Sequence, residues 1–365
     1  MTVVLFVIIL AALVFVHELG HFLAAKVSGI RVDEFGLGFP PRIVGIKRGE
    51  TVYSINWIPF GGFVKIFGEN PDEESTAGPD KSRSFVHKPK SIQAFVLVAG
   101  VTFNALFAWF LLSLGFMIGM PVPAGYSTTA QVAHPQVTII TLVKGDPAEK
   151  AGFKEGDILT HLQSGQDAQA ITKVDDVQNF IGSHPNQTVA VEYIRSGAKL
   201  TANVVPATGI VAERAAIGVS LDEMGVLQLP FFQSVYEGLK LTGFVIQDTA
   251  GGLWAFLRQI VVGKAQLSQV TGPVGIAGLV GDAARLGFVY LLSFTAFISI
   301  NLAVINLIPF PALDGGRLLV TIIEKIKGSA VNAKWINMTN LVGFCILITF
   351  MVVVTFHDIW NLFQH

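Results

Sequence analysis

The first apolar stretch of the chain contains two histidines and a glutamate, in the sequence VFVHELGHFLAA (residues 14–25). On a helix, residues four apart lie on one face, so the imidazoles of His17 and His21 can reach a single divalent ion. Glu18 then lies beside a water molecule on that ion, which is the arrangement of a catalytic zinc site. The alternative is a chance motif or a structural hydrogen-bond cluster. Leaving two imidazoles and a carboxylate unpaired in lipid is costly, which favours the metal site.

A catalytic zinc site needs a third protein ligand and one open position. The single cysteine, Cys345, excludes a cysteine cluster, so any ligands are nitrogen and oxygen atoms. Asp314, in the sequence NLIPFPALDGG (residues 306–316), is the acidic residue with a matching apolar context. Pro309 and Pro311 end the apolar helix there. The glycine pair after Asp314 lets the backbone turn, so that the carboxylate can project into the helix bundle.

A hydrolytic metal site also needs a donor for any developing oxyanion. Asn306, which precedes Asp314 by about two helical turns, is our candidate for this role or for holding the substrate backbone. The alternative for Asn306 is an interhelical hydrogen bond of the kind that asparagine makes in helix bundles. The same two interpretations apply to Asn104, with the interhelical hydrogen bond favoured.

The composition indicates a membrane protein, because 52% of the 365 residues are hydrophobic, 14% are charged and the mean hydropathy is +0.58. Four stretches are long enough to cross a hydrocarbon core of about 30 Å as helices. They are residues 3–27, 92–119, 288–309 and 339–360. A net charge of −1 without long basic tracts gives no sign of a nucleic-acid partner.

Lysine and arginine are concentrated in two loops, one after the first span and one before the last, and the positive-inside rule places both in the cytoplasm. Both termini and the segment 121–235 then face outward, and the candidate metal ligands lie toward the cytoplasmic side. Residues 234–264 favour an interfacial amphipathic helix. A fifth span at 241–263 is the alternative, and it would move the C-terminus to the cytoplasm. Residues 271–282 favour a re-entrant or interfacial loop.

Two segments have the alternating pattern of β-strands. ETVYSINWIPFGGFVKIFGE (residues 50–69), in the first cytoplasmic loop, predicts a small sheet at 52–67 whose apolar side chains suit partial immersion in the membrane. An ordinary hairpin on the cytosolic surface is the alternative. Residues 130–228 predict a soluble, mostly β domain with one helix near 174–183. Within it, GDPAEKAGFKEGDILTHL (residues 145–162) resembles PDZ domains, a fold that binds peptides at a sheet edge.

We therefore expect an α-helical multi-pass membrane protein with about four transmembrane helices, a membrane-associated β-sheet in the first cytoplasmic loop and an inserted extracytoplasmic PDZ domain. Residues 1–120 contain the first two transmembrane helices and the β-loop. Residues 121–230 contain the PDZ domain. Residues 231–365 contain the interfacial or re-entrant segments and the last two transmembrane helices.

The order of these features resembles the site-2 protease family of intramembrane zinc metalloproteases, in particular its bacterial RseP-like branch. The resemblance consists of HExxH in the first span, IPFGGFVKIFGE (residues 58–69), a PDZ insert, GPVGIA (residues 272–277) and an N-x-x-P-x-x-x-L-D-G motif ending at Gly315. Proteobacterial members of that branch usually have two tandem PDZ domains, whereas this chain has room for one.

The resemblance implies that His17, His21 and Asp314 bind Zn²⁺ and that Glu18 is the catalytic base. It also implies hydrolysis of peptide bonds within or near the transmembrane segments of single-span proteins, such as anti-sigma factors or remnant signal peptides, in the plasma membrane. The PDZ domain then binds substrate C-termini or filters substrates by size. The alternative is a different class of function, a non-catalytic, zinc-stabilised transporter or PDZ scaffold, which does not require Glu18.

Overall fold

The computed structural model describes residues 2–70, 73–126, 130–195, 197–211, 214–264 and 270–363. These residues form two compact units. The helical unit comprises Met1–Leu114, Val235–Ala284 and Leu291–His365. The β unit comprises Gly115–Ser234 and Arg285–Tyr290, so it covers the region for which the sequence predicts a PDZ domain.

Four helices of the described residues are long and apolar enough to cross a membrane, the number predicted from the sequence. They are α1 (Thr2–Val27), α3 (Lys90–Ile118), α8 (Phe288–Asn306) and α10 (Ala333–Phe363). The other short helices of the helical unit are α2 (Glu73–Ala77), η1 (Lys81–Arg83), η2 (Phe85–His87) and α9 (Asp314–Lys327). α8 ends at Asn306 rather than at residue 309, since Pro309 has no backbone N–H to continue the helix.

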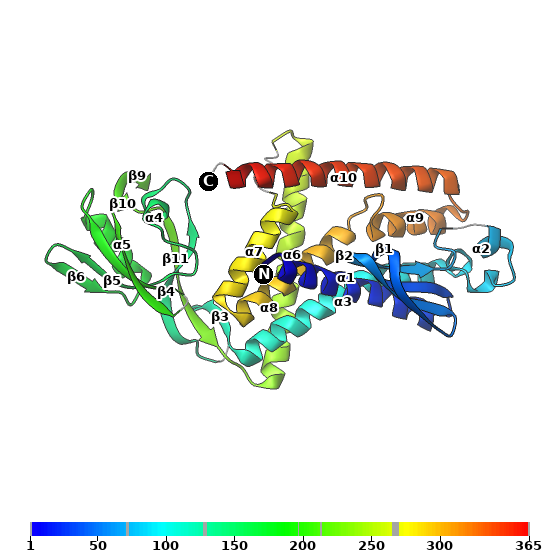
Figure 1. Ribbon diagram of the computed structural model, residues 1–365, viewed down its shortest axis with the longest axis horizontal. Helices are drawn as coiled ribbons and strands as arrows, with labels where there is room; N and C mark the ends of the chain where they lie inside the picture. Colours follow the sequence, from blue (N-terminus) through cyan, green and yellow to red (C-terminus); the bar gives the residue numbers. More distant parts are fainter. Residues whose placement is uncertain are drawn as a thin grey trace. The chain divides into compact units, whose positions relative to one another are not determined.

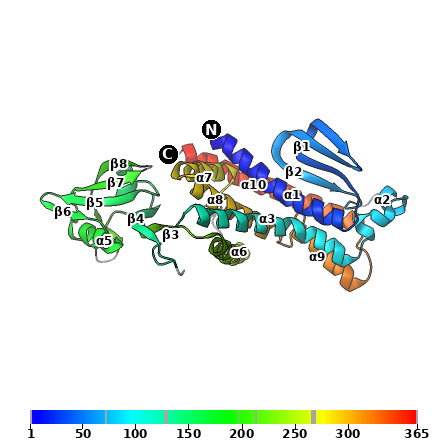
Figure 2. The ribbon, with the colours of Figure 1, turned by 90° about the horizontal axis from the view of Figure 1, so that it is seen from below.

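The helix α6 (Phe231–Val261) runs across the direction of α1 and α3 rather than along it (Figures 1 and 2). It packs on α3, where the indole N–H of Trp109 donates to the carbonyl of Val235 at 2.9 Å. It is not among the helices of the described residues that are apolar enough to cross a membrane. Its direction and composition favour the interfacial helix over a fifth span at 241–263.

The helix α7 (Pro273–Leu286) replaces the loop expected at 271–282, so that expectation was wrong. The backbone N–H groups of Gly272 and Gly275 donate to the carboxylate of Asp358 on α10, at 3.2 and 2.8 Å. A carboxylate at a helix start satisfies N–H groups that have no partner within the helix. A glycine-rich segment therefore becomes helical with the help of a side chain distant in the sequence.

The strands β1 (Val32–Arg48) and β2 (Thr51–Ile66) form an antiparallel sheet in the loop where the sequence predicts one, although the strand β1 was not predicted. Each strand bends and contributes two segments to the sheet. In order across the sheet, the segments are 42–48, 51–56, 34–37 and 62–65. The strand β2 lies beside α1 (Figure 2). Its edge segment 62–65 is the part next to Glu18, because a Cβ on Gly62 would be 3.8 Å from Cγ of Glu18.

In the β unit, seven strands form one sheet in the order β3-β11-β4-β5-β7-β8, with β6 paired to β5, and β9 pairs with β10. The strands are β3 (Met120–Pro123), β4 (Ala133–Leu142), β5 (Ile158–Ser164), β6 (Asp167–Ala170), β7 (Val189–Arg195), β8 (Ala198–Val204), β9 (Ala207–Val211), β10 (Arg214–Ala216) and β11 (Val219–Leu227). The helices α4 (Pro147–Lys150) and α5 (Val174–Ser183) complete a core that contains Ala148, Phe180 and Leu162. A mostly β unit with a helix at 174–183 agrees with the sequence prediction.

Candidate metal centre

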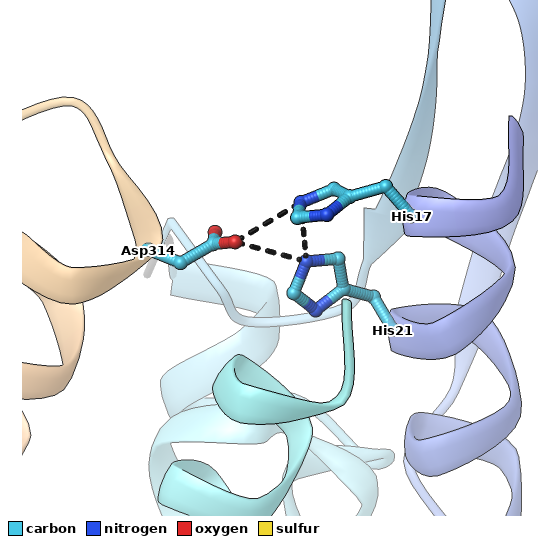
Figure 3. A group of neighbouring side chains, drawn as sticks. All are labelled: His17, His21 and Asp314. Atoms are coloured by element: carbon cyan, nitrogen blue, oxygen red, sulfur yellow. Dashed lines mark hydrogen bonds and ion pairs between the residues drawn. The ribbon is translucent and has the colours of Figure 1, made fainter. Parts of the chain in front are cut away.

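His17 and His21 lie on consecutive turns of one face of α1, as their spacing predicts, and their rings point to the same side (Figure 3). Both residues are buried, with exposed fractions of 7% and 6%. Their Nε2 atoms are 3.2 Å apart. Two imidazole nitrogens this close need either a shared proton or a shared cation.

Asp314 is the first residue of α9 and faces the two histidines from the far side of the site (Figure 3). One of its carboxylate oxygens, Oδ2, lies 3.0 Å from Nε2 of His17 and 3.3 Å from Nε2 of His21. The structure thus brings together the three residues that the sequence proposed as metal ligands. The loop 307–313 after α8 provides the break in the helix that this arrangement requires.

The glycine pair after Asp314 has a different role from the one expected. Gly315 and Gly316 do not make the turn, because both lie within the first turn of α9. A Cβ on either would be 2.2 Å from a backbone oxygen, that of Ile308 or that of Phe310. Glycine is needed there because the loop backbone packs directly on the helix start. The left-handed conformation in this loop belongs to Ala312, with φ +75°.

The three ligand atoms form a nearly equilateral triangle with sides of 3.0, 3.2 and 3.3 Å. Tetrahedral zinc with bonds of about 2.0–2.1 Å needs ligand atoms about 3.3–3.4 Å apart, so the triangle has the size that zinc requires. Oδ2 of Asp314 is buried and, among the described residues, has no hydrogen-bond partner beyond the two imidazoles. The donor set of two imidazoles and one carboxylate is also that of catalytic zinc sites.

The charge of Asp314 suits this role. Burial disfavours the carboxylate, but the adjacent imidazoles of His17 and His21 outweigh burial and hold the pKa of Asp314 below its usual range. Arg317, one turn further along α9, forms an ion pair with Glu69 in the loop after β2. The start of α9 is therefore tied to the sheet by a charged contact.

One face of α3 forms the back wall of the site, and the residues Val96, Gly100 and Asn104 lie on it at four-residue spacing. The carbonyl of Val96 accepts a hydrogen bond from Nδ1 of His21 at 2.8 Å. The side-chain amide of Asn104 lies 3.2 Å from Nδ1 of His17. A Cβ on Gly100 would be 2.3 Å from Nε2 of His21, so glycine lets α3 approach both rings. The interhelical hydrogen bond of Asn104 that the sequence favoured thus has His17, a candidate metal ligand, as its partner.

A cavity of about 340 Å³ opens beside the ligand triangle. Its walls include Glu18 and Asp314, together with Asn306 from the end of α8 and Gly62 from the edge segment of the sheet. The same edge segment lies beside Glu18, since a Cβ on Gly62 would be 3.8 Å from its Cγ atom. A chain that enters this cavity therefore meets the triangle, a carboxylate and a strand edge together.

The sequence of this chain is similar to those of known proteins. Residues 5–350 match peptidase family M50. The zinc metalloprotease RasP of Geobacillus kaustophilus is 30% identical over 428 residues, which cover 99% of this chain and 98% of the relative. A protein of Clostridium perfringens, provisionally named a zinc metalloprotease, is 35% identical over 350 residues, which cover 96% of each chain.

The solved PDZ domain of an SdrC-like protein from Listeria monocytogenes is 19% identical and covers 25% of this chain and 93% of its own, with a TM-score of 0.22. A TM-score this low does not by itself establish a fold, so the PDZ assignment rests on the sequence of residues 145–162 and on the strands and helices of the β unit. For the whole chain, the family match covers the ligand triangle and all four membrane-length helices at least in part. The chain belongs to peptidase family M50 and is a multi-pass membrane zinc metalloprotease.

Proposed function

We propose that this enzyme hydrolyses peptide bonds within or near the transmembrane segments of other membrane proteins. The observation that carries the proposal is the position of the ligand triangle. Two of its members, His17 and His21, are buried on a helix long and apolar enough to span a membrane. Glu18 belongs to the same helix. Substrate must therefore reach the site from the membrane or its interface rather than from a cleft in a soluble domain.

The proposed roles follow from the chemistry of each group. His17, His21 and Asp314 hold zinc, which when bound polarises the scissile carbonyl and acidifies a water molecule. Glu18 takes the proton from that water and passes it to the leaving amine, a general acid–base step that contributes about 10²–10⁴-fold to the rate. Asn306 donates to the oxyanion or to the substrate backbone. Its place in the wall of the same cavity as Glu18 supports this role.

The substrate helix must unwind at the site, because a helical peptide bond is shielded by its own hydrogen bonds. The edge segment 62–65 is next to Glu18 and offers backbone groups with which an extended chain can pair. The same sheet exposes large apolar side chains, with Ile46 70% and Trp57 67% exposed. Such exposure supports partial immersion of the sheet in the membrane over an ordinary cytosolic hairpin.

The proposed orientation follows the distribution of lysine and arginine. The ligand triangle lies toward the cytoplasmic side of the plasma membrane, and the β unit, as a PDZ domain, is extracytoplasmic. In this position the β unit meets the outer part of a single-span substrate, and it binds a newly cut C-terminus or excludes large outer domains. Suitable substrates are anti-sigma factors or remnant signal peptides after another protease has removed the outer domain.

The test is the substitution Glu18→Gln in a strain that expresses a tagged single-span substrate. We expect cleavage to be abolished while the zinc content stays near one ion per chain. The control is Asp248→Asn, which removes an exposed carboxylate from α6 and is expected to leave cleavage unchanged. Mass spectrometry of the wild-type product locates the cut bond.

The competing interpretation is a zinc-stabilised transporter or scaffold. Cleavage that persists in Glu18→Gln would remove Glu18 from its role as base. A cut bond far outside the transmembrane segment would contradict the intramembrane assignment, even if Glu18 proved essential.

A further inference from the structure

Each histidine that binds a metal through Nε2 must place the proton of its neutral ring on Nδ1. For His21 the partner of that proton is clear. Nδ1 lies 2.8 Å from the backbone carbonyl of Val96, and a carbonyl only accepts, so Nδ1 of His21 is the donor. The Nε2 atom of His21 therefore turns a lone pair toward the ligand triangle.

For His17 the partner of Nδ1 is the side-chain amide of Asn104, at 3.2 Å. Asn104 has no exposed surface. Its backbone is held from the other side, where the hydroxyl of Ser299 on α8 donates to the Asn104 carbonyl at 2.8 Å. This contact fixes the backbone of Asn104 against α8, and burial shields its side-chain amide and the imidazole from solvent.

An asparagine amide can present either its oxygen or its nitrogen to a neighbour, because a half-turn about its last bond exchanges the two atoms. In the structure, Nδ2 of Asn104 faces the imidazole of His17, and Oδ1 is buried without a hydrogen-bond partner. A half-turn of the amide brings this unpartnered oxygen to Nδ1 of His17, where it can accept the ring proton. The imidazole therefore decides which orientation holds when the site is loaded.

We propose that Asn104 is a positioning residue that turns its amide oxygen to His17 and accepts the Nδ1 proton, which fixes the tautomer that leaves Nε2 free to bind zinc. This inference rests on the proposed role of His17 as a zinc ligand. The neutral amide gives the ring an acceptor without adding a second negative charge beside Asp314. With the carbonyl of Val96, it makes one face of α3 the outer support of both histidines.

The experiment measures metal binding rather than cleavage, on full-length protein carrying Glu18→Gln so that turnover plays no part. Zinc affinity is determined by chelator competition, and the geometry of the site is monitored by the visible absorption of cobalt(II) substituted for zinc. The variants are Asn104→Leu, which has a similar size but no acceptor, and Asn104→Asp, which is an acceptor only. The control is Asn301→Leu, because the Asn301 amide donates to the carbonyl of Phe297 within α8.

We expect Asn104→Leu to weaken zinc binding by about 10–100-fold, as loss of an outer partner of a metal ligand does, and to alter the cobalt spectrum. Asn104→Asp is expected to retain the spectrum and to bind zinc within about threefold of the parent, because the acceptor is preserved. Asn301→Leu is expected to match the parent. If Asn104→Leu does not fold, Asn104→Ser, whose short hydroxyl cannot reach the ring, takes its place.

Two results would overturn the proposal. One is parental affinity and spectrum in the variant without an acceptor. The other is Asn104→Asp binding as weakly as Asn104→Leu, which would mean that Asn104 acts as a donor or only as packing. Neither result depends on whether Glu18 is the base, so failure of this inference is separate from failure of the proposed protease mechanism.

Discussion

At Gly100, the addition of a single methyl group is expected to weaken metal binding strongly. The substitution Gly100→Ala adds one methyl group on the face of α3 that supports the two histidines. That methyl carbon would be 2.3 Å from Nε2 of His21 and 2.8 Å from Cε1 of His17. The nearest atom of His21 is Nε2, the atom that we propose as a metal ligand, so the clash falls on the proposed ligand itself.

The size of the effect follows from these distances. Carbon and nitrogen atoms in ordinary contact are about 3.5 Å apart, so a ring or the helix must move by about 1 Å. Metal sites tolerate ligand shifts of only about 0.2 Å. A misplacement of about 1 Å at a catalytic site reduces the rate by about 100-fold. We therefore expect at least a 10-fold loss of zinc affinity and about a 100-fold loss of cleavage, with overpacking that costs about 1–3 kcal/mol of stability.

The assay combines zinc content, chelator competition, cleavage of a tagged single-span substrate and thermal unfolding, all on the full-length protein. The matched control is Gly243→Ala, because Gly243 also lies within a helix but a Cβ there would meet nothing within 4 Å. An alanine there is expected to be neutral or to stabilise by about 0.5–1 kcal/mol. Parental zinc affinity and cleavage in Gly100→Ala would refute the close approach of α3 to the imidazoles.

Two further predictions concern stability and are checked by hydrogen exchange on the full-length protein. Arg195→Met removes the two hydrogen bonds, of 2.7 and 2.6 Å, that Arg195 donates to the fully buried carboxylate of Asp157, which keeps only the backbone N–H of Lys154. It is expected to destabilise the β unit by about 3 kcal/mol, seen as faster exchange in its core strands. Asp358→Ala removes the acceptor of two N–H groups at the start of α7, which is expected to cost about 1 kcal/mol and to speed exchange there.

Conservative variants provide the controls for both predictions. Arg195→Lys keeps the positive charge but cannot make the paired contact, so its effect is expected to be smaller than that of Arg195→Met. Asp358→Asn keeps one acceptor oxygen and is expected to fall between the parent and Asp358→Ala. Unchanged exchange in Arg195→Met or Asp358→Ala would show that the contact concerned does not limit local opening.

The grouping of His17, His21 and Asp314 could be predicted from the sequence because each residue carries a local signal. His17 and His21 share a helix, and their spacing alone places them on one face. Asp314 stands out as an acidic residue at a proline-broken apolar helix end. The four membrane-length helices could also be predicted, since length and apolar composition suffice to identify them.

The outer support of the site could not be predicted in the same way. Val96 and Gly100 look like ordinary residues of an apolar span, and their importance depends on how α3 is rotated against α1. No periodicity within a single helix encodes that rotation. The strand β1 was missed for a related reason, because its segment 34–37 pairs with both segments of β2 and its sequence contains two consecutive prolines. The start of the helix α7 is hydrogen-bonded to Asp358, which is about 80 residues away in the sequence. A local sequence pattern cannot reveal such a tertiary contact.

The separation of the metal ligands along the chain also has a consequence for biosynthesis. The ribosome makes His17 and His21 near the start of translation, whereas Asp314 emerges only after the β unit and three of the four membrane-length helices have been made. A nascent chain with two imidazoles alone lacks the third ligand of a catalytic zinc site. The group formed by His17, His21 and Asp314 therefore stays incomplete until most of the chain has been synthesised.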